Sequence, residues 1–400
     1  MFDVSSVRKR FPALLDGAAH FDGPGGSQVP DLVGDAVSTT LTSAIANRGA
    51  VTAAARHADA VVVAARRAMA DLLGADPRGI VFGRSMTALT YDFSRTLAKT
   101  WSRGDEVVVT RLDHDANIRP WVSAAEAVGA TVRWADFDRD TGELSVEDVC
   151  ALVSDRTRLV AVTGASNLIG TRPDVTQIAR RCHEVGSLVY VDGVHLTPHA
   201  PVDVTAQGVD FYACSPYKFM GPHCGVVAAR PDLLERLNPD KLLPSSNAVP
   251  EKFELGTLPY ELLAGTTAAV NFIAGLIPGE DTRRQRMVAV MAALESYEEG
   301  VRRRIEGGLL ELGGVTLHGH AAHRTPTLLF SVDRQDSGAV STRLGAFGVN
   351  APAGSFYALE ASRWLGLGDG GGIRVGVAAY TDDSDVDRLL GGLEQIVRAG

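Results

Sequence analysis

Residues 211–225 read Phe-Tyr-Ala-Cys-Ser-Pro-Tyr-Lys-Phe-Met-Gly-Pro-His-Cys-Gly, an apolar run that stops at a proline, an aromatic residue and a single lysine. The run Phe211–Cys214 predicts a buried strand, and Gly221-Pro222 predicts a turn just after the lysine. A lysine held between a strand end and a turn is partly desolvated, and burial lowers the pKa of its amine. A neutral amine can form a Schiff base. Lys218 is therefore a candidate nucleophile, although most lysines are simply exposed on the surface.

Strands and helices alternate through the first two thirds of the chain. Apolar, β-branched runs predict strands at 80–82, 106–110, 131–136, 158–163, 188–192, 210–214 and 226–229. Helical periodicity predicts helices at 31–47, 57–73, 87–100, 118–128, 146–152 and 175–185. Strands buried on both faces and separated by helices predict an α/β fold with a mostly parallel, seven-stranded sheet flanked by helices.

After Pro259 the pattern changes to long helices and fewer strands. Helices are expected at 262–276, 281–311 and 384–398, and strands at 315–317, 327–332 and 373–377. This change predicts a smaller α+β C-terminal domain. We expect a large domain over residues 21–260 and a small domain over 261–400. Residues 1–20 are expected to form a short helix and an exposed lead-in that packs with the small domain.

The composition is that of a soluble globular protein, with 45% hydrophobic and 22% charged residues in a chain of 400. A net charge of −9 without a basic block argues against nucleic acid or an anionic membrane as a partner. No apolar segment is long enough to cross a bilayer, and Met1–Phe11 lacks the apolar core of a signal peptide. The four cysteines show no CxxC spacing, which favours a reducing compartment. We therefore expect a cytoplasmic protein.

Polar residues directly follow several of the predicted strands. Ligands of open α/β sheets bind beyond the carboxyl ends of the strands, so these residues belong to one candidate site. They are Ser85, Met86, Thr87, Asp113, His114, Ser166, Asn167, Asp192, His195, Ser215, Tyr217 and Lys218. Each has a simpler explanation as a turn or capping residue. Their shared position is what favours a functional site.

The chemistry of these residues matches pyridoxal 5′-phosphate (PLP). Lys218 supplies an amine for an aldehyde, and a buried carboxylate at Asp192 requires a cation such as a protonated pyridine nitrogen. A helix that begins at Ser85–Thr87 offers its N-terminus to a phosphate. His114 could lie on an aromatic ring, and Asn167 could bind a phenolic oxygen. A lysine Schiff base with an aspartate partner for the pyridinium is a signature of this cofactor.

Two further motifs carry weaker signals. Phe21–Pro30 is rich in glycine, but it lacks the spacing of a dinucleotide site or a P-loop and predicts a turn at the rim of a cleft. His318, His320 and His323 suggest a metal site, but no acidic or cysteine ligand stands near them in the sequence. We expect a structural or exposed role for these histidines and no metal.

The chain resembles the class V aminotransferases, a branch of the fold-type I PLP enzymes, and within them the cysteine desulfurase-like proteins. The resemblance covers about residues 20–398. It is most specific at 21–30, 104–121, 190–195 (Tyr-Val-Asp-Gly-Val-His), 201–204, 215–222 (Ser-Pro-Tyr-Lys-Phe-Met-Gly-Pro) and 253–257. It implies a PLP-binding large domain and a homodimer with active sites at the interface.

The resemblance also implies a role for each matching residue. Lys218 would hold PLP and move protons at Cα and Cβ, Asp192 would keep the pyridine nitrogen protonated, and His114 would stack on the ring and take part in acid–base steps. Asn167 and His195 would lie on the side of the phenolic oxygen. The rest of the cofactor-binding set would be Met86, Thr87, Ser215, Tyr217 and, reaching the phosphate of a partner subunit, Thr257. Arg374 would bind the substrate carboxylate, beside Asn167 and Tyr357.

Departures from the cysteine desulfurases bear on the reaction. His195 stands where those enzymes usually carry glutamine, and Tyr217 where they usually carry histidine. Their sulfur-accepting cysteine falls near Tyr357, and no cysteine follows Cys224 in this chain. A persulfide-forming enzyme requires a mobile thiolate, whereas Cys214 ends a strand and is expected to be buried and inert.

Without an acceptor thiol, we expect β-elimination of the C–S lyase type on cysteine or a cysteine derivative. Lys218 would accept the proton at Cα, and His114 or Tyr357 would donate one to the leaving group. An aminotransferase, an epimerase or racemase, and a cysteine desulfurase with an external thiol acceptor remain open, because fold does not fix reaction. A catalytically silent binding protein is the alternative outside enzymes.

Overall fold

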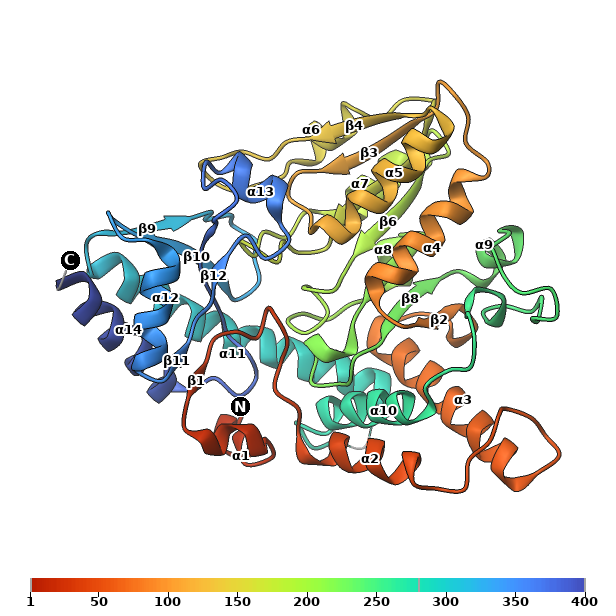
Figure 1. Ribbon diagram of the computed structural model, residues 1–400, viewed down its shortest axis with the longest axis horizontal. Coiled ribbons are helices and arrows are strands. Elements are labelled where there is room, and N and C mark those ends of the chain that lie inside the picture. Colours follow the sequence, from red (N-terminus) through yellow and green to blue (C-terminus); the bar gives the residue numbers. More distant parts are fainter. Residues whose placement is uncertain (1, 280, 399–400) are drawn as a thin grey trace.

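The computed structural model describes residues 2–279 and 281–398, and its larger part is built on a seven-stranded sheet (Figure 1). The sheet order is β2-β8-β7-β6-β5-β3-β4. The strands are β2 (Ile80–Gly83), β3 (Glu106–Thr110), β4 (Thr131–Ala135), β5 (Thr157–Thr163), β6 (Leu188–Asp192), β7 (Phe211–Cys214) and β8 (Gly225–Ala229). Only β8 runs antiparallel to its neighbours β7 and β2. The predicted α/β fold with a mostly parallel sheet is confirmed.

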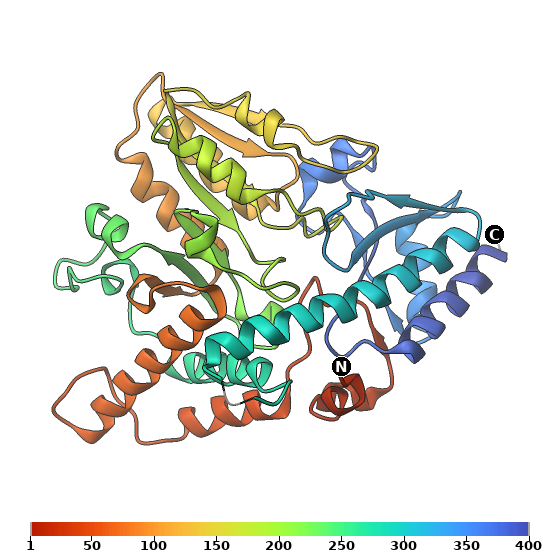
Figure 2. The ribbon, with the colours of Figure 1, turned by 180° about the vertical axis from the view of Figure 1, so that it is seen from behind.

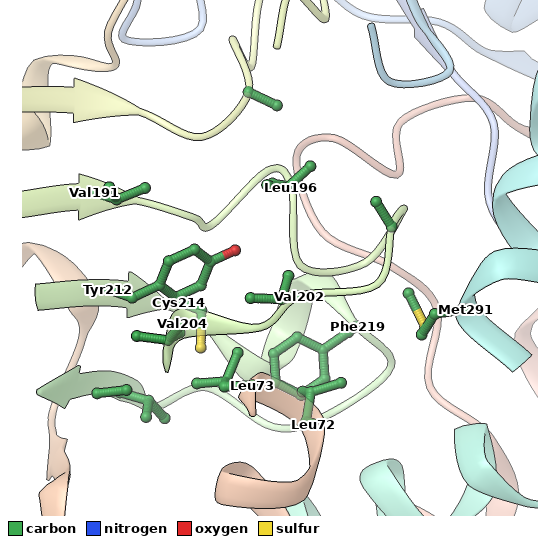
Figure 3. Close-up of a cluster of buried hydrophobic side chains, with 14 of the residues drawn as sticks. Leu72, Leu73, Val191, Leu196, Val202, Val204, Tyr212, Cys214, Phe219 and Met291 are labelled. Atoms are coloured by element: carbon green, nitrogen blue, oxygen red, sulfur yellow. The ribbon is translucent and has the colours of Figure 1, made fainter. Parts of the chain in front are cut away.

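The central strands are apolar on both faces because helices cover both faces. Along β3, Val107 and Val109 pack into one core with α4 (Met86–Ala98) and α5 (Arg119–Val128). Val108, between them, packs into the opposite core with α3 (Ala53–Leu73) and α7 (Val175–His183). Figure 3 shows part of this second core, to which Tyr212 of β7, Leu72 of α3 and Met291 of the long helix α11 (Arg283–Glu311) belong. The short helices α6 (Val146–Cys150), α8 (Val204–Gln207) and α9 (Pro231–Arg236) complete the connections.

The C-terminal part is built on a four-stranded antiparallel sheet, ordered β12-β13-β10-β9. Its strands are β9 (Val315–His318), β10 (Thr327–Val332), β12 (Ala353–Gly354) and β13 (Gly372–Gly376). The helices around it are α12 (Ser337–Ala346), α13 (Leu359–Trp364) and α14 (Asp383–Arg398). The long helix α11 (Arg283–Glu311) spans both parts, as Figure 2 shows from behind. Near its start lies α10 (Tyr260–Ala274), which packs on α2 (Asp31–Leu41) and α3.

The N-terminal segment contacts the C-terminal part. β1 (Ala19–His20) pairs in parallel with β11 (Val349–Asn350). Arg8, in α1 (Val4–Arg8), forms ion pairs with Asp382 at 3.0 Å and Asp385 at 2.6 Å. The expectation of an exposed lead-in is wrong for Ala19 and His20, which are buried, and Ala19 packs into the core of the C-terminal part. The division of the chain at residue 260 stays a prediction.

Several element boundaries differ from the predicted ones. α2 ends at Leu41 instead of residue 47, and a polar, glycine-containing segment follows Leu41. The sequence did not reveal α12, or the two-residue strands β11 and β12, since elements this short or rich in glycine carry no periodic pattern. None of the helices found in the described residues is long and apolar enough to span a bilayer.

Candidate active site

A cavity of about 620 Å³ lies beyond the carboxyl ends of β5, β6 and β7. The C-terminal part closes it from the opposite side through Phe356, Tyr357 and Arg374. Twelve predicted site residues line it, namely Ser85, Met86, Thr87, His114, Asn167, Asp192, His195, Ser215, Tyr217, Lys218, Tyr357 and Arg374. Pro24 and Gly25 line it as well, so the glycine-rich loop does lie at the rim.

Lys218 is presented by the turn that ends β7. The chain forms a 3₁₀ turn at Pro216–Lys218, which is closed by a hydrogen bond from the Phe219 N–H to the Pro216 carbonyl at 2.9 Å. Lys218 Nζ donates to the carbonyl of Gly25 at 3.0 Å and to that of Pro24. Burial, with repulsion from Arg374, lowers the pKa of the amine to about 7, although Asp192 opposes the shift. A large fraction of this amine is therefore neutral near pH 7.

Asp192 is the last residue of β6 and is only 4% exposed. Its Oδ1 accepts a hydrogen bond from the Val194 N–H at 2.9 Å, and among the described residues it forms no ion pair, although the charge of Lys218 acts on it. Burial raises the pKa of this carboxyl to about 7. A buried carboxylate in this state is stabilised strongly by any cation placed beside it. A protonated pyridine nitrogen would be such a cation.

His114 follows β3 and caps the 3₁₀ turn Asp115–Asn117. Its Nδ1 accepts a hydrogen bond from the Ala116 N–H at 3.0 Å, so the proton of the neutral ring is on Nε2. Burial and the cations Lys218 and Arg374 lower the pKa of His114 to about 4. The ring is therefore neutral at pH 7, which suits stacking on a flat cofactor.

A helix N-terminus forms another side of the cavity. Ser85 caps α4 by accepting a hydrogen bond from the Ala88 N–H at 3.1 Å. Gly225 of β8 allows this helix start to lie against the sheet, because a Cβ at that position would stand 2.2 Å from the Ser85 carbonyl carbon. The N–H groups and dipole of a helix start favour an anion such as a phosphate. Thr87 and Ser215 add hydroxyls to this side.

Arg374, in β13, is 2% exposed and faces the cavity from the C-terminal part. Its Nη1 donates to the Asn167 carbonyl at 2.9 Å, and the Phe356 ring lies 3.7 Å from its Cζ. Its Nε is buried without a hydrogen-bond partner. Burial lowers the pKa of the guanidinium to about 9, so it stays charged at pH 7. An anion in the cavity would satisfy the free edge of this side chain.

These features fit PLP. A neutral lysine amine, a buried carboxylate without a cation, a helix start for a phosphate and a ring-stacking imidazole all face one cavity. Asn167 Oδ1 is also buried without a partner, as Arg374 Nε is, so the cavity contains polar atoms that await a ligand. The model of the family described as Aminotransferase class-V matches residues 19–389. The chain belongs to this family.

The relatives of this class V chain extend over its whole length. It is 33% identical to the uncharacterized protein MT3887 of Mycobacterium tuberculosis, with 99% of both chains covered. It is 31% identical to the aminotransferase-like protein FGM3 of Gibberella zeae, again over 99% of both chains. Among solved structures it is similar to the cysteine desulfurase CsdA of Escherichia coli, with a TM-score of 0.87, 26% identity and coverage of 100% of this chain and 99% of that one.

The class V chain is therefore a PLP-dependent enzyme of the cysteine desulfurase-like group, with the fold-type I architecture. The roles of its individual residues stay predictions. Thr257 is exposed and does not line the cavity of its own chain. Asp113 turns away from the cavity: it is fully buried and accepts a hydrogen bond from Asn117 at 2.7 Å, which orients the start of α5.

No cysteine is among the described residues that line the cavity. Cys182, Cys214 and Cys224 are buried, and burial raises the pKa of the Cys224 thiol to about 11 and that of Cys214 well above its usual range. None of these thiols is an activated thiolate. Tyr357 stands at the mouth of the cavity and is 76% exposed.

Sequence reasoning missed Phe356, which covers Arg374 and whose carbonyl accepts a hydrogen bond from Asn167 Nδ2 at 2.9 Å. Phe356 and Tyr357 both have positive φ, +52° and +59°, which is strained for aromatic residues. The Tyr357 carbonyl accepts a hydrogen bond from the Asp115 N–H at 2.7 Å, which holds the strained pair in place. No feature of the local sequence indicates this conformation.

The three histidines of the suggested metal site form no candidate metal cluster among the described residues, and His318 Nε2 bonds Ser331 at 3.0 Å.

Proposed function

We propose that this enzyme is a C–S lyase that removes the sulfur substituent of cysteine or a cysteine derivative by β-elimination. One observation carries the proposal: the cavity combines the PLP-binding residues and Arg374 with no thiol among its described lining residues. A desulfurase keeps the sulfur on a protein cysteine, whereas elimination releases it. The similarity to cysteine desulfurase CsdA supports a cysteine-type substrate.

Substrate binding falls to the C-terminal side of the cavity. The Nε of Arg374, which has no partner, lies on the edge of the guanidinium that does not bond Asn167, and this edge can donate hydrogen bonds to an α-carboxylate. Phe356 covers the guanidinium face and keeps water from it. A carboxylate bound there fixes one end of the amino acid and leaves Cα and Cβ free to lie near Lys218.

Bound PLP supplies an electron sink for the electrons released at Cα. Lys218 is suited to take the Cα proton, because its amine titrates near pH 7 and is a usable base there. The electron pair of the Cα–H bond then forms a Cα–Cβ double bond while the Cβ–S bond breaks, and the sulfur leaves with its electron pair and takes up a proton. After addition of one water, the products from cysteine are hydrogen sulfide, pyruvate and ammonium.

The proton for the departing sulfur comes from the mouth of the cavity in this proposal. His114 is neutral, and its Nδ1 is already bonded to the Ala116 N–H, so it is a weak acid. The Tyr357 side chain lies beside the His114 ring, with centroids 5.5 Å apart, and reaches solvent. Tyr357 can therefore donate its hydroxyl proton and recover one from water.

Amino transfer is the second candidate, because the relative FGM3 is named aminotransferase-like and the same residues can serve that reaction. It differs in requiring a keto acid as the amino acceptor.

We also propose that the enzyme is a homodimer, which the exposed position of Thr257 supports, since a residue that reaches a partner's phosphate must lie on the surface of its own subunit.

The deciding experiment incubates the PLP-loaded enzyme with L-cysteine and with S-substituted cysteines and measures pyruvate, ammonium and free thiol or sulfide. Equal amounts of the three products without any keto acid or added thiol support the lyase. Products that appear only with a keto acid, together with a new amino acid, identify an aminotransferase. Alanine with sulfur transferred to an added thiol identifies a desulfurase, loss of optical activity identifies a racemase, and binding without turnover identifies a silent protein.

A further inference from the structure

His195 uses one ring nitrogen inside the protein and leaves the other for the cavity. The side chain is 3% exposed and belongs to the cavity lining. Its Nε2 lies 2.9 Å from Oγ1 of Thr327, the first residue of β10 in the C-terminal part. Its Nδ1 has no hydrogen bond to any residue in the described ranges, yet it is not among the buried polar atoms without a partner, so it is open to the cavity.

The direction of the bond between Thr327 and His195 follows from burial. Thr327 is 0% exposed, and within the described residues its hydroxyl bonds only His195. If Nε2 carried the proton, the threonine hydrogen would be buried with no acceptor, which costs the full desolvation of a donor. If the hydroxyl donates instead, only a second oxygen lone pair stays unfilled, which is much less costly. The hydroxyl therefore donates, Nε2 accepts, and the proton of the neutral ring is on Nδ1.

The surroundings keep this imidazole neutral. Burial, with the charges of His199, Arg374 and Lys218, holds the pKa of His195 well below its usual value. The His199 ring meets the His195 ring edge-on, with centroids 5.2 Å apart. The Glu298 carboxylate bonds His199 Nδ1 at 2.8 Å and forms no hydrogen bond to His195. A neutral ring has one N–H, so the tautomer decides whether the nitrogen that faces the cavity is a hydrogen-bond donor or an acceptor.

We propose that Thr327 is a positioning residue that fixes His195 in its Nδ1–H tautomer, so that His195 presents a hydrogen-bond donor to the phenolic oxygen of PLP. The donor, His195, then belongs to the large part of the chain, whereas Thr327, which decides which of its ring nitrogens carries the proton, belongs to the C-terminal part. Thr327 pairs with Gly376 in the sheet, two residues beyond Arg374. One end of this small sheet thus serves both the carboxylate site and the cofactor.

The first test reads the tautomer itself. The enzyme is labelled with ¹⁵N-histidine, and two-bond ¹H–¹⁵N correlation spectra are recorded for the apoenzyme and the PLP-loaded enzyme. Comparison with His195→Gln identifies the His195 signals. We expect the protonated nitrogen to be Nδ1 in both forms. A proton found on Nε2, or equal populations of the two tautomers, overturns the proposal without any substitution at Thr327.

The second test reads the cofactor. A donor at the phenolic oxygen stabilises negative charge that is greatest when the lysine-linked cofactor is deprotonated, so loss of the donor raises the pH midpoint of its visible absorption. Thr327→Val, which keeps the shape and removes the hydroxyl, is expected to raise this midpoint by about half a pH unit or more. Thr327→Ser keeps the hydroxyl and is expected to restore the midpoint of the unmodified enzyme.

A double substitution separates positioning from a general structural effect. Glutamine at position 195 donates through an amide that has no tautomers, so Thr327→Val should change the midpoint much less in the His195→Gln background than alone. Equal shifts in the two backgrounds, or no shift with Thr327→Val alone, overturn the proposal. The reading depends on bound PLP and not on which reaction the enzyme performs, so failure of the C–S lyase proposal leaves it intact.

Discussion

The two walls of the cavity are built in different ways. The sheet wall consists of His114, Asn167, Asp192 and Lys218, each placed where a strand of the large sheet ends. The C-terminal wall consists of Phe356, Tyr357 and Arg374, which come from a strained loop and an antiparallel strand. The sheet wall holds the groups that suit a cofactor, and the C-terminal wall holds those that suit a substrate. We therefore expect substitutions in the sheet wall to act mainly on the cofactor, and substitutions of Phe356 and Arg374 to act mainly on substrate binding.

Removal of the Lys218 amine from the sheet wall should have the largest effect on the elimination rate. We expect Lys218→Ala to lower the elimination rate by about 10³-fold or more, because it removes both the covalent anchor and the base. The visible absorption of the lysine-linked cofactor should vanish as well. Lys99→Ala, at an exposed lysine that bonds Asp240, is the matched control and should change the rate less than about twofold. Full activity in Lys218→Ala would disprove the assignment of the sheet wall.

The rate at which the Lys218 amine reacts with an aldehyde, measured against pH, tests the sheet wall without catalytic turnover. Only the neutral amine attacks an aldehyde, and the pKa of Lys218 lies near 7 because burial disfavours the ammonium. The rate of capture of a non-ionising aldehyde by the apoenzyme should therefore rise about tenfold per pH unit up to about pH 7 and then level off. A rate that still rises at pH 9 would show an ordinary, solvated lysine. Lys218→Ala gives the background from other amines.

On the C-terminal wall, Arg374→Lys should have the largest effect. Lysine keeps the charge but cannot offer two parallel donors to a carboxylate. We expect KM for the amino acid to rise about 10- to 100-fold, with a smaller change in kcat. The preference for cysteine over cysteamine, which lacks the carboxylate, should fall with it. Arg363→Lys, at an exposed arginine paired with Asp369, is the control. An unchanged preference would place the carboxylate elsewhere.

The difference between the walls also explains what the sequence could predict. The strand ends of β6 and β7 were recognisable from local runs of apolar residues, and a parallel sheet brings its carboxyl ends together. Asp192 and Lys218 were therefore found as a group. Arg374 could be assigned only through the family resemblance. Phe356 and Thr327 were missed, because their roles depend on contacts across 189 positions with Asn167 and 132 positions with His195.

Phe356→Leu should weaken the C-terminal wall without removing any charge. The Phe356 ring lies on the Arg374 guanidinium, and a cation–π contact of this kind contributes about 0.5–2 kcal/mol. We expect kcat/KM to fall about 3- to 10-fold, mainly through KM, since the arginine loses its fixed orientation. Phe356→Tyr retains a ring and should stay within about twofold. An effect on the visible absorption of the cofactor would contradict the separation of the two walls.

A loss of similar size is expected from Tyr357→Phe, which removes one hydroxyl and keeps the ring beside His114. Because Tyr357 is 76% exposed, water can replace it as a proton donor, and the loss in kcat for L-cysteine should be only about three- to tenfold. An S-aryl cysteine releases a more stable thiolate that needs no proton, so its rate should not change. Equal losses for both substrates would show that Tyr357 positions the substrate instead of protonating the sulfur. The ratio of the two losses thus decides whether the C-terminal wall takes part in bond breaking or only in binding.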